Sequence, residues 1–497
     1  MRLDPVEVRE THISRVLLTR DRAFKFKKPV RLPFVDYSTL ERRHSFCREE
    51  VRLNRRLAPD IYRGVRAVVA TETGVELAPE DADGAVDYVV EMRRYDERCT
   101  LAHRLAAGSA GEAEVCAVGR RLAEFHASAD LPPQPEGAVP ALAAMLAENF
   151  ATLQALGADV DDAERLADAF VSGRRAELER RARAGLVRDG HGDLRAEHVV
   201  LERGIEIVDC VEFDPTLRQI DVGLDLAFLV MDLLRHDERP AAALVRAYRE
   251  AGGDPGDDAL LSFFAAQRAL IRAKVALVRA TQVDPVDAAR RRADAASLLE
   301  LANRLGWGLR LGPAVIVCGP AASGKSTLAA ALVERAGATV LSSDAVRKEL
   351  AGIAPTARAS ADTYEPAMNR RTYTGLGARA RELVGAGQRV VVDATFRFTA
   401  DREAFASAFT NAADVMWIEC RAPAEVLVAR ASARERRPGV SDAGPSIAFR
   451  QTREWQPLAT PEHLVVRTDR DGAAVLAAVR DGLDARLRGE LRSGTVV

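Results

Sequence analysis

The stretch AVIVCGPAASGKSTLAAALV, residues 314–333, decides the fold of the second half of the chain. Five apolar residues typical of a buried strand precede the pattern G-x-x-x-x-G-K-S at 319–326, and a helix-forming run follows it. Glycines allow backbone N–H groups to close around phosphate oxygens, and the N-terminus of a helix favours negative charge. The stretch therefore predicts a phosphate-binding loop between a strand and a helix.

The polar residues of this loop have expected roles toward ATP and Mg²⁺. Lys325 supplies a compact positive charge to the β- and γ-phosphates during transfer, and Ser326 supplies a hydroxyl ligand for Mg²⁺. Asp393 ends the apolar run Val390-Val391-Val392 and is expected beside the same metal ion. The residues expected to hold the nucleotide here are Gly319, Ser323, Gly324, Lys325, Ser326 and Thr327.

Further apolar runs at 338–341, 389–392 and 415–418 alternate with helical segments, which predicts a parallel α/β sheet. Asp344 follows the first of these runs, where it is expected to accept the proton of an acceptor hydroxyl. Arg347 lies one helical turn further on and is expected to hold an anionic group. The alternative is that Asp344 caps the helix and Arg347 is a solvated neighbour.

A basic helix end precedes Pro438 and consists of Arg430, Arg434, Arg436 and Arg437. It is expected either to close over ATP as a lid, with Arg430 and Arg434 on the nucleotide, or to form a solvated face. With the D-x-x-R pattern at 344–347, residues 313–470 resemble the P-loop small-molecule and polynucleotide 5′-kinases. Since 71 Lys+Arg oppose 73 Asp+Glu, no broad basic surface is expected, which makes a nucleic-acid partner unlikely and favours a small-molecule acceptor.

The first half carries HGDLRAEH at 191–198, a predicted hairpin at 198–208, and then Asp209. This spacing is typical of phosphotransfer in kinase-like folds. It resembles the aminoglycoside phosphotransferase/choline kinase superfamily, whose loop reads H-G-D-x-x-x-x-N. The resemblance implies Asp193 as the base that orients the acceptor hydroxyl and Asp209 as a Mg²⁺ ligand, with Glu212 or Asp214 as alternatives for Asp209. His198 stands where asparagine is expected; imidazole can ligate a divalent metal, although magnesium prefers oxygen.

Only six lysines occur in the chain, and two of them, Lys25 and Lys27, share one face of a predicted strand at 22–27. Kinase-like folds pair such a lysine with a helix glutamate, so one of the two is expected on the ATP phosphates. In the predicted helix at 38–57, Glu50 lies nearer the apolar stripe than Glu49 and is the favoured partner. By resemblance, Asp225 is expected to hold the catalytic loop, and residues 88–93 are expected to be the hinge where adenine sits.

These patterns predict an α+β protein-kinase-like bilobal domain at 1–305, with an N-lobe to about 95 and a helical C-lobe from 96. A linker at 306–313 and an α/β P-loop domain with a parallel sheet at 314–497 follow. The chain resembles a bacterial family that fuses an aminoglycoside phosphotransferase-like half to a P-loop half of the AAA, zeta-toxin and polynucleotide-kinase type. This implies an ATP- and Mg²⁺-dependent kinase with two nucleotide sites, acting on hydroxyl groups of small molecules.

Two alternatives remain at this point. Either only the P-loop half is catalytic and the first half is a regulatory or ligand-binding pseudokinase, or the protein is an antibiotic-modifying kinase of the aminoglycoside type. No apolar run is long enough to span a bilayer, and six dispersed cysteines contain no C-x-x-C pair. We therefore expect no membrane partner and a cytoplasmic location. Neither the acceptor nor the oligomeric state follows from the sequence.

Overall fold

The computed structural model describes residues 7–11, 13–32, 35–72, 74–354, 365–411, 415–435, 444–459, 463–490 and 495–496. The chain divides into two compact units, the first formed by residues 1–148 and 176–271 and the second by residues 149–175 and 272–497. The chain thus passes between the units three times. Within the described residues, no helix is long and apolar enough to cross a membrane.

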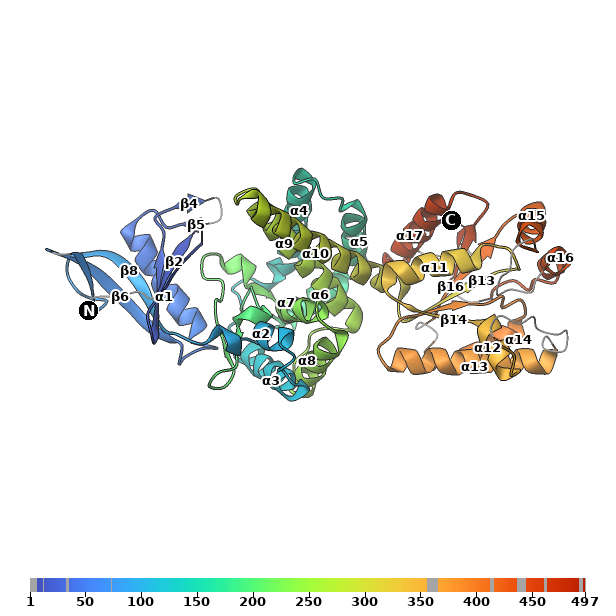
Figure 1. Cartoon of the computed structure of the whole chain (residues 1–497), viewed down its shortest axis with the longest axis horizontal. Helices are drawn as coiled ribbons and strands as arrows, with labels where there is room; N and C mark the ends of the chain where they lie inside the picture. Colours follow the sequence, from blue (N-terminus) through green and yellow to red (C-terminus); the bar gives the residue numbers. More distant parts are fainter. Residues whose placement is uncertain are drawn as a thin grey trace. The chain divides into compact units, whose positions relative to one another are not determined.

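Unit 1 begins with a six-stranded antiparallel sheet in the order β1-β2-β3-β8-β6-β7 (Figure 1). Helix α1 packs against it through Cys47 and Val51, which meet Val65 and Val90 of the sheet. The elements are β1 (Glu7–Glu10), β2 (Ser14–Leu18), β3 (Arg22–Lys27), β4 (Arg31–Leu32), β5 (Val35–Asp36), α1 (Leu40–Asn54), β6 (Tyr62–Thr71), β7 (Gly74–Ala78) and β8 (Ala85–Arg93).

The predicted strand at 22–27 is confirmed as β3, which pairs with β2 in the register Val16 to Lys25 and Ser14 to Lys27. Helix α1 begins later than predicted. Its N-cap is Thr39, whose side chain accepts a hydrogen bond from the backbone N–H of Arg42, whereas Ser38 bonds back to Asp36. Thr39 rather than Ser38 caps the helix because Asp36 binds the Ser38 hydroxyl.

The rest of unit 1 is mainly helical and gives it the α+β, bilobal architecture of kinase-like folds. Two short antiparallel strand pairs, the hairpin β10-β11 and the pair β9-β12, frame the loop at 190–198. The elements are α2 (Leu101–Ala106), α3 (Glu112–Ser128), α4 (Ala138–Ala155), α6 (Arg175–Arg183), β9 (Val187–Asp189), β10 (Val199–Val200), β11 (Glu206–Ile207), β12 (Gln219–Asp221), α7 (Val222–Leu234), α8 (Glu238–Glu250) and α9 (Asp258–Ala280). Helices α4 and α9 each continue into unit 2, from residues 149 and 272.

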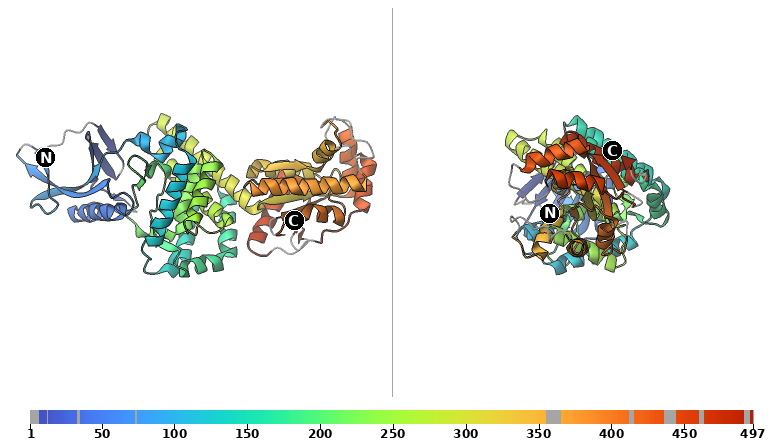
Figure 2. Two further views of the ribbon diagram at one scale, coloured as in Figure 1. Left: turned by 90° about the horizontal axis from the view of Figure 1, so that it is seen from below. Right: turned by 90° about the vertical axis from the view of Figure 1, so that its right-hand side faces the viewer.

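Unit 2 has a parallel sheet in the order β14-β15-β13-β16-β17-β18, covered by helices on both faces (Figures 1 and 2). Leu332 of α11 and Val479 of α17 fill one face of the sheet, while Leu376 of α13 and Phe405 of α14 fill the other. The elements are β13 (Ala314–Cys318), α11 (Lys325–Ala336), β14 (Thr339–Ser342), α12 (Ser343–Leu350), α13 (Pro366–Gly385), β15 (Val390–Asp393), α14 (Thr399–Ala406), β16 (Val415–Arg421), α15 (Ala424–Glu435), α16 (Pro445–Arg453), β17 (His463–Arg467), α17 (Gly472–Leu487) and β18 (Thr495–Val496).

The predicted linker at 306–313 differs from the structure, because helix α10 (Pro285–Leu311) continues through most of it. Gly306 and Gly308 allow close packing rather than a turn. A Cβ at these positions would lie 2.8 Å from Leu166 and 2.5 Å from Arg389. The predicted boundary at residue 305 accordingly falls inside unit 2.

Unit 2 also contains helix α5 (Asp161–Gly173), which packs on α17 and α10. Buried Arg310 of α10 joins the three helices: its Nε lies 2.6 Å from Asp484 and its Nη1 lies 2.9 Å from Asp162. The P-loop sheet therefore shares its packing with a segment that precedes it in the chain by about 150 residues.

Candidate active sites

Lys25 and Lys27 both bind the same carboxylate on α1. The Nζ atoms of Lys25 and Lys27 each lie 2.8 Å from one oxygen of Glu50, which is 1% exposed. Burial acts to raise the pKa of Glu50, but the two ammonium groups outweigh it and hold that pKa below its usual value. Glu50, the glutamate favoured from the sequence, is thus the one that contacts the lysines of β3.

The two lysines differ in their second partners. Lys25 Nζ lies 2.8 Å from Asp209 Oδ1, whereas Lys27, 1% exposed, pairs with Glu212, whose Oε1 also accepts a hydrogen bond of 2.9 Å from the Tyr37 hydroxyl. Burial acts to lower the pKa of both lysines, but the facing carboxylates raise it well above its usual value. Both lysines therefore carry a positive charge.

A cavity of about 1190 Å³ opens beside this cluster and is lined by Lys25, His198 and Asp209 together with Met92 and Tyr95. Lys27, Glu50 and Glu212 are not among its lining residues. Lys25 is therefore the lysine placed to meet a ligand there. The cavity also reaches residues 92–96, at the end of β8 and just beyond it, so it overlaps residues 88–93, where the adenine-binding hinge is predicted.

Asp209 has φ of 66°, in the left-handed region that aspartate tolerates better than most residues. Its side chain is about half exposed, with Oδ1 on Lys25 and Oδ2 3.8 Å from His198 Nε2. The Lys25 ammonium holds the pKa of Asp209 well below its usual range. An ionised, half-exposed carboxylate at a cavity is a donor that fits Mg²⁺. Asp214, one of the alternatives, instead caps a turn through the backbone N–H of Thr216.

Asp225 holds the catalytic loop, as predicted. Its Oδ2 and Oδ1 accept hydrogen bonds of 2.7 and 2.9 Å from the backbone N–H groups of His191 and Gly192. Burial acts to raise the pKa of Asp225, but the hydrogen bond from His126 and nearby charges hold it well below its usual range. An ionised buried carboxylate thus fixes the backbone two residues before Asp193.

Asp193 is about one quarter exposed and receives a 3.0 Å hydrogen bond on Oδ2 from Arg195 Nε. His198 contacts both residues: its Nδ1 lies 2.8 Å from the backbone carbonyl of Asp193, and its Nε2 lies 2.8 Å from Arg195 Nη2. Burial lowers the pKa of His198 to about 4. The predicted role of His198 as a metal ligand stays a prediction, and this engagement of Nε2 argues against it. Arg195 was not predicted, although its place inside the loop motif was a usable signal.

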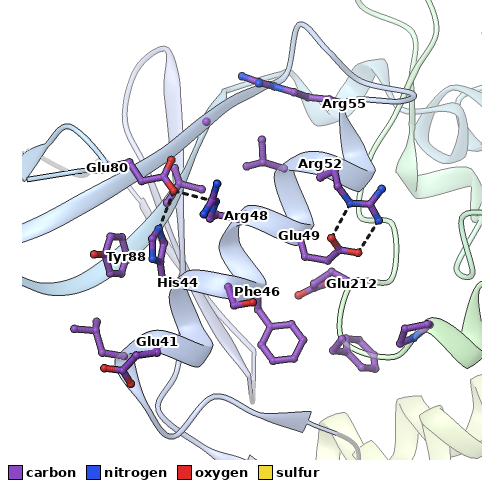
Figure 3. Close-up of a pocket in the computed structure, with 17 residues that line it drawn as sticks. Glu41, His44, Phe46, Arg48, Glu49, Arg52, Arg55, Glu80, Tyr88 and Glu212 are labelled. Carbon is purple, nitrogen blue, oxygen red and sulfur yellow. Dashed lines mark hydrogen bonds and ion pairs between the residues drawn. The ribbon is translucent and has the colours of Figure 1, made fainter.

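The outer face of α1 explains why Glu49 is not the lysine partner. Its carboxylate accepts two 2.7 Å hydrogen bonds from Arg52 (Figure 3). It also accepts one of 3.1 Å from Arg218. This face borders a second cavity of about 1140 Å³, where His44 stacks on Tyr88. Glu49 and Glu50 therefore leave α1 in different directions, Glu49 toward Arg52 and Glu50 toward the two lysines.

The phosphate-binding loop of unit 2 has the backbone that its sequence predicts. Gly324 has φ of 85° and directly precedes α11, so the N-terminus of this helix faces the loop. Gly319 has φ of 145°, and a Cβ there would lie 2.5 Å from the carbonyl oxygen of Cys420. Both positions therefore require glycine.

A cavity of about 1210 Å³ lies against this loop and is lined by Lys325, Ser326, Thr327 and Arg430. Ser323 and Gly319 belong to the loop, but they are buried and do not line the cavity. Arg430 donates a 2.6 Å hydrogen bond from Nη2 to the carbonyl of Thr468, so it closes one side of the cavity. Arg434 belongs to α15, but its side chain, like Arg436 and Arg437, lies outside the described residues.

Asp393 ends β15, next to the strand that leads into the phosphate loop. Its Oδ1 is buried and, among the described residues, has no hydrogen-bond partner. A buried carboxylate oxygen without a donor is costly unless a cation meets it, so this position fits a Mg²⁺ ligand.

Asp344 and Arg347 lie in α12 and bind each other, with Arg347 Nη1 3.0 Å from Asp344 Oδ1. Arg347 is buried and also reaches Asn369 at 3.2 Å. The N-cap of α12 is Ser342, so Asp344 does not cap this helix. The solvated alternative for Arg347 is wrong, because α13 covers it.

Two contacts of the phosphate loop escaped prediction. Gln451 of α16 accepts a 2.7 Å hydrogen bond from the backbone N–H of Ala321, and the Thr468 hydroxyl donates one of 2.6 Å to the carbonyl of Ser323. Thr468 follows β17, whose apolar run Leu464-Val465-Val466 was the available signal for a further strand.

Comparison with known proteins finds one family match and several similar solved structures. Residues 315–458 match a family described as an AAA domain. A gluconokinase from Sinorhizobium meliloti 1021 is 20% identical and covers 36% of this chain and 94% of its own, with a TM-score of 0.27. A choline kinase from Cryptosporidium parvum Iowa II is 10% identical and covers 60% of this chain and 89% of its own, with a TM-score of 0.35.

A relative from Mycobacterium tuberculosis H37Rv, "Uncharacterized protein Rv2004c", matches along most of the chain. It is 35% identical over an alignment of 464 positions, which covers 89% of this chain and 89% of the relative. Mb2027c of Mycobacterium bovis matches over the same extent. The chain belongs to the same protein family as Rv2004c.

Proposed function

We propose that the protein is a kinase with two ATP sites, one in each unit, and that it transfers the γ-phosphate to hydroxyl groups of small molecules. The observation that carries this proposal is the meeting of Lys25, Glu50 and Asp209 at 2.8 Å, from three segments of the chain, beside a cavity. A lysine, its glutamate and a cavity-facing aspartate are the groups that a phosphate-transferring site requires.

In unit 1, Lys25 binds phosphate oxygens of ATP, and Asp209 holds Mg²⁺. The metal ion supplies positive charge against the developing negative charge of the phosphates. Asp193 accepts the proton of the acceptor hydroxyl while the hydroxyl oxygen forms a bond to the γ-phosphorus. The bond from this phosphorus to the bridging oxygen breaks, and ADP leaves.

In unit 2, Lys325 and the loop N–H groups bind the phosphates, and Ser326 and Asp393 hold Mg²⁺. Asp344 accepts the acceptor proton, and Arg347 holds an anionic group of the acceptor. Arg430 and Arg434 cover the nucleotide from the lid side. The buried Asp393 oxygen without a donor supports the metal position in this unit.

The structure gives little support to the alternatives. A pseudokinase has no need for the assembled pair of Lys25 and Glu50 beside an ionised Asp209. An acceptor of the aminoglycoside type is a polycation and favours acidic surroundings, whereas Asp193 has Arg195 against its carboxylate.

The test offers γ-labelled ATP and a metabolite extract to the full chain and to Asp193→Asn and Lys325→Ala. Exposed Asp60→Asn serves as a matched control for the loss of one carboxylate. We expect each site variant to lose a different labelled product by about 10²-fold or more, while the control keeps both. If no protein labels anything or hydrolyses ATP, the proposal fails. If Lys325→Ala removes every product and Asp193→Asn none, only the P-loop unit is catalytic.

A further inference from the structure

Arg195 lies at the centre of the catalytic loop of unit 1, and its guanidinium binds three groups. Its Nε donates to Asp193 Oδ2 at 3.0 Å, its Nη2 lies 2.8 Å from His198 Nε2, and its Nη1 binds Glu197. Its side chain is 14% exposed, so this cation is largely held inside the site.

The hydrogen bonds of His198 fix which ring nitrogen carries the proton. Nδ1 lies 2.8 Å from the backbone carbonyl of Asp193, and because a carbonyl only accepts, Nδ1 is the donor. Arg195 only donates, so Nε2 of the neutral ring must accept from Nη2. The lone pair that a metal ion would need is therefore bound to a guanidinium N–H.

Kinase-type catalytic loops carry asparagine at the position of His198, and its amide oxygen serves a second Mg²⁺ ion. Mg²⁺ requires oxygen ligands in near-octahedral geometry. Here the position offers a nitrogen, and that nitrogen faces Arg195. Asp209 Oδ2 lies 3.8 Å from this nitrogen. The residues present fit one metal ion on Asp209 and do not fit a second one between Asp209 and residue 198.

We propose that Arg195, held by His198, supplies the positive charge that a second metal ion supplies in other kinase-type sites, so that the N-terminal site works with one divalent cation per nucleotide. This inference rests on the proposed function of unit 1. Arginine suits the role because its guanidinium is always charged and offers several donors in one plane. While Nε keeps Asp193 oriented and Nη2 stays on His198, Nη1 can exchange the exposed Glu197 for an oxygen of the γ-phosphate.

The test counts metal ions directly. In full-length protein carrying Lys325→Ala, which disables the P-loop site, Mn²⁺ binding is measured by electron paramagnetic resonance with saturating AMP-PNP, a non-hydrolysable ATP analogue. We expect one Mn²⁺ per bound nucleotide. Two Mn²⁺ per nucleotide would overturn the inference and leave the proposed function standing. Absence of nucleotide binding in this protein would overturn the proposed function of unit 1 and the inference with it.

Two variants in the same background sharpen the result. His198→Asn restores an oxygen ligand and releases Arg195, so a second Mn²⁺ should bind. Arg195→Met should weaken AMP-PNP binding about tenfold and change ADP binding less than twofold, because the guanidinium is assigned to the γ-phosphate. Equal weakening of both nucleotides would show that Arg195 only supports the loop and would refute its assigned role.

Discussion

Replacing Lys27 with methionine should strongly destabilise unit 1, because the ammonium of Lys27 is held inside the sheet by two carboxylates. The ammonium is 1% exposed and is bound by Glu50 and Glu212. Methionine fills a similar volume but removes the positive charge. Glu212 then stays buried and, among the described residues, keeps the hydrogen bond from the Tyr37 hydroxyl. Removing one partner of a buried ion pair costs about 3–5 kcal/mol. With a urea dependence of about 2–3 kcal/mol per M, the midpoint of unfolding should fall by about 1–2 M.

The assay uses the distribution of tryptophans as an internal reference. Trp307, Trp417 and Trp455 all belong to unit 2, so their fluorescence follows that unit. Hydrogen exchange of backbone N–H groups in β3 and α1 follows unit 1. We expect faster exchange there and an unchanged fluorescence transition.

Lys28→Met is the matched control, because Lys28 lies on the opposite face of the chain, is 25% exposed and pairs with exposed Glu10. Its urea midpoint should stay within error of the wild type. A Lys27→Met protein as stable as this control would refute the reasoning, since it would mean that the pair with Glu212 contributes nothing.

Three further outcomes are expected. His198 has a pKa of about 4 in the folded state, below its unfolded value of about 6.5, so the stability it contributes is present above pH 6.5 and is lost as the pH falls toward 4. Chemical denaturation of the nucleotide-free protein measures the free energy of unfolding between pH 6.5 and 4. As the pH falls, this free energy should decrease less steeply for His198→Asn than for the wild type, by up to about 1.4 kcal/mol per pH unit. The same pH dependence in both proteins would contradict this. Arg310→Met should lower the stability of unit 2 by about 3–5 kcal/mol in the tryptophan transition, while exposed Arg304→Met on the same helix should not. Gln451→Leu should weaken ADP binding at the P-loop about fivefold in calorimetry on a Lys25→Met background, and an unchanged affinity would refute its role on the loop.

Much of the candidate site was readable from local patterns. The phosphate loop is one continuous motif, and its glycines adopt the backbone angles that the motif demands. Helical phase alone placed Glu50 rather than Glu49 toward the strand, because one residue along a helix turns a side chain by about 100°. These predictions succeeded because each depends on a few neighbouring residues.

The remaining features depend on contacts between distant segments. Lys25 and Lys27 are equivalent on their strand, and only the loop at 209–212 distinguishes them, since Asp209 binds one and Glu212 the other. Gln451 reaches Ala321 across 130 residues. Gly306 and Gly308 signalled a boundary in sequence, but close packing inside a helix uses the same residue type.

The most direct test of two ATP sites is the stoichiometry of nucleotide binding. Equilibrium dialysis of the full chain with AMP-PNP and Mg²⁺ should give two nucleotides bound per chain. Lys25→Met and Lys325→Ala should each bind one, and the double variant should bind none. A single nucleotide per wild-type chain, or one substitution that abolishes both binding events, would contradict the account.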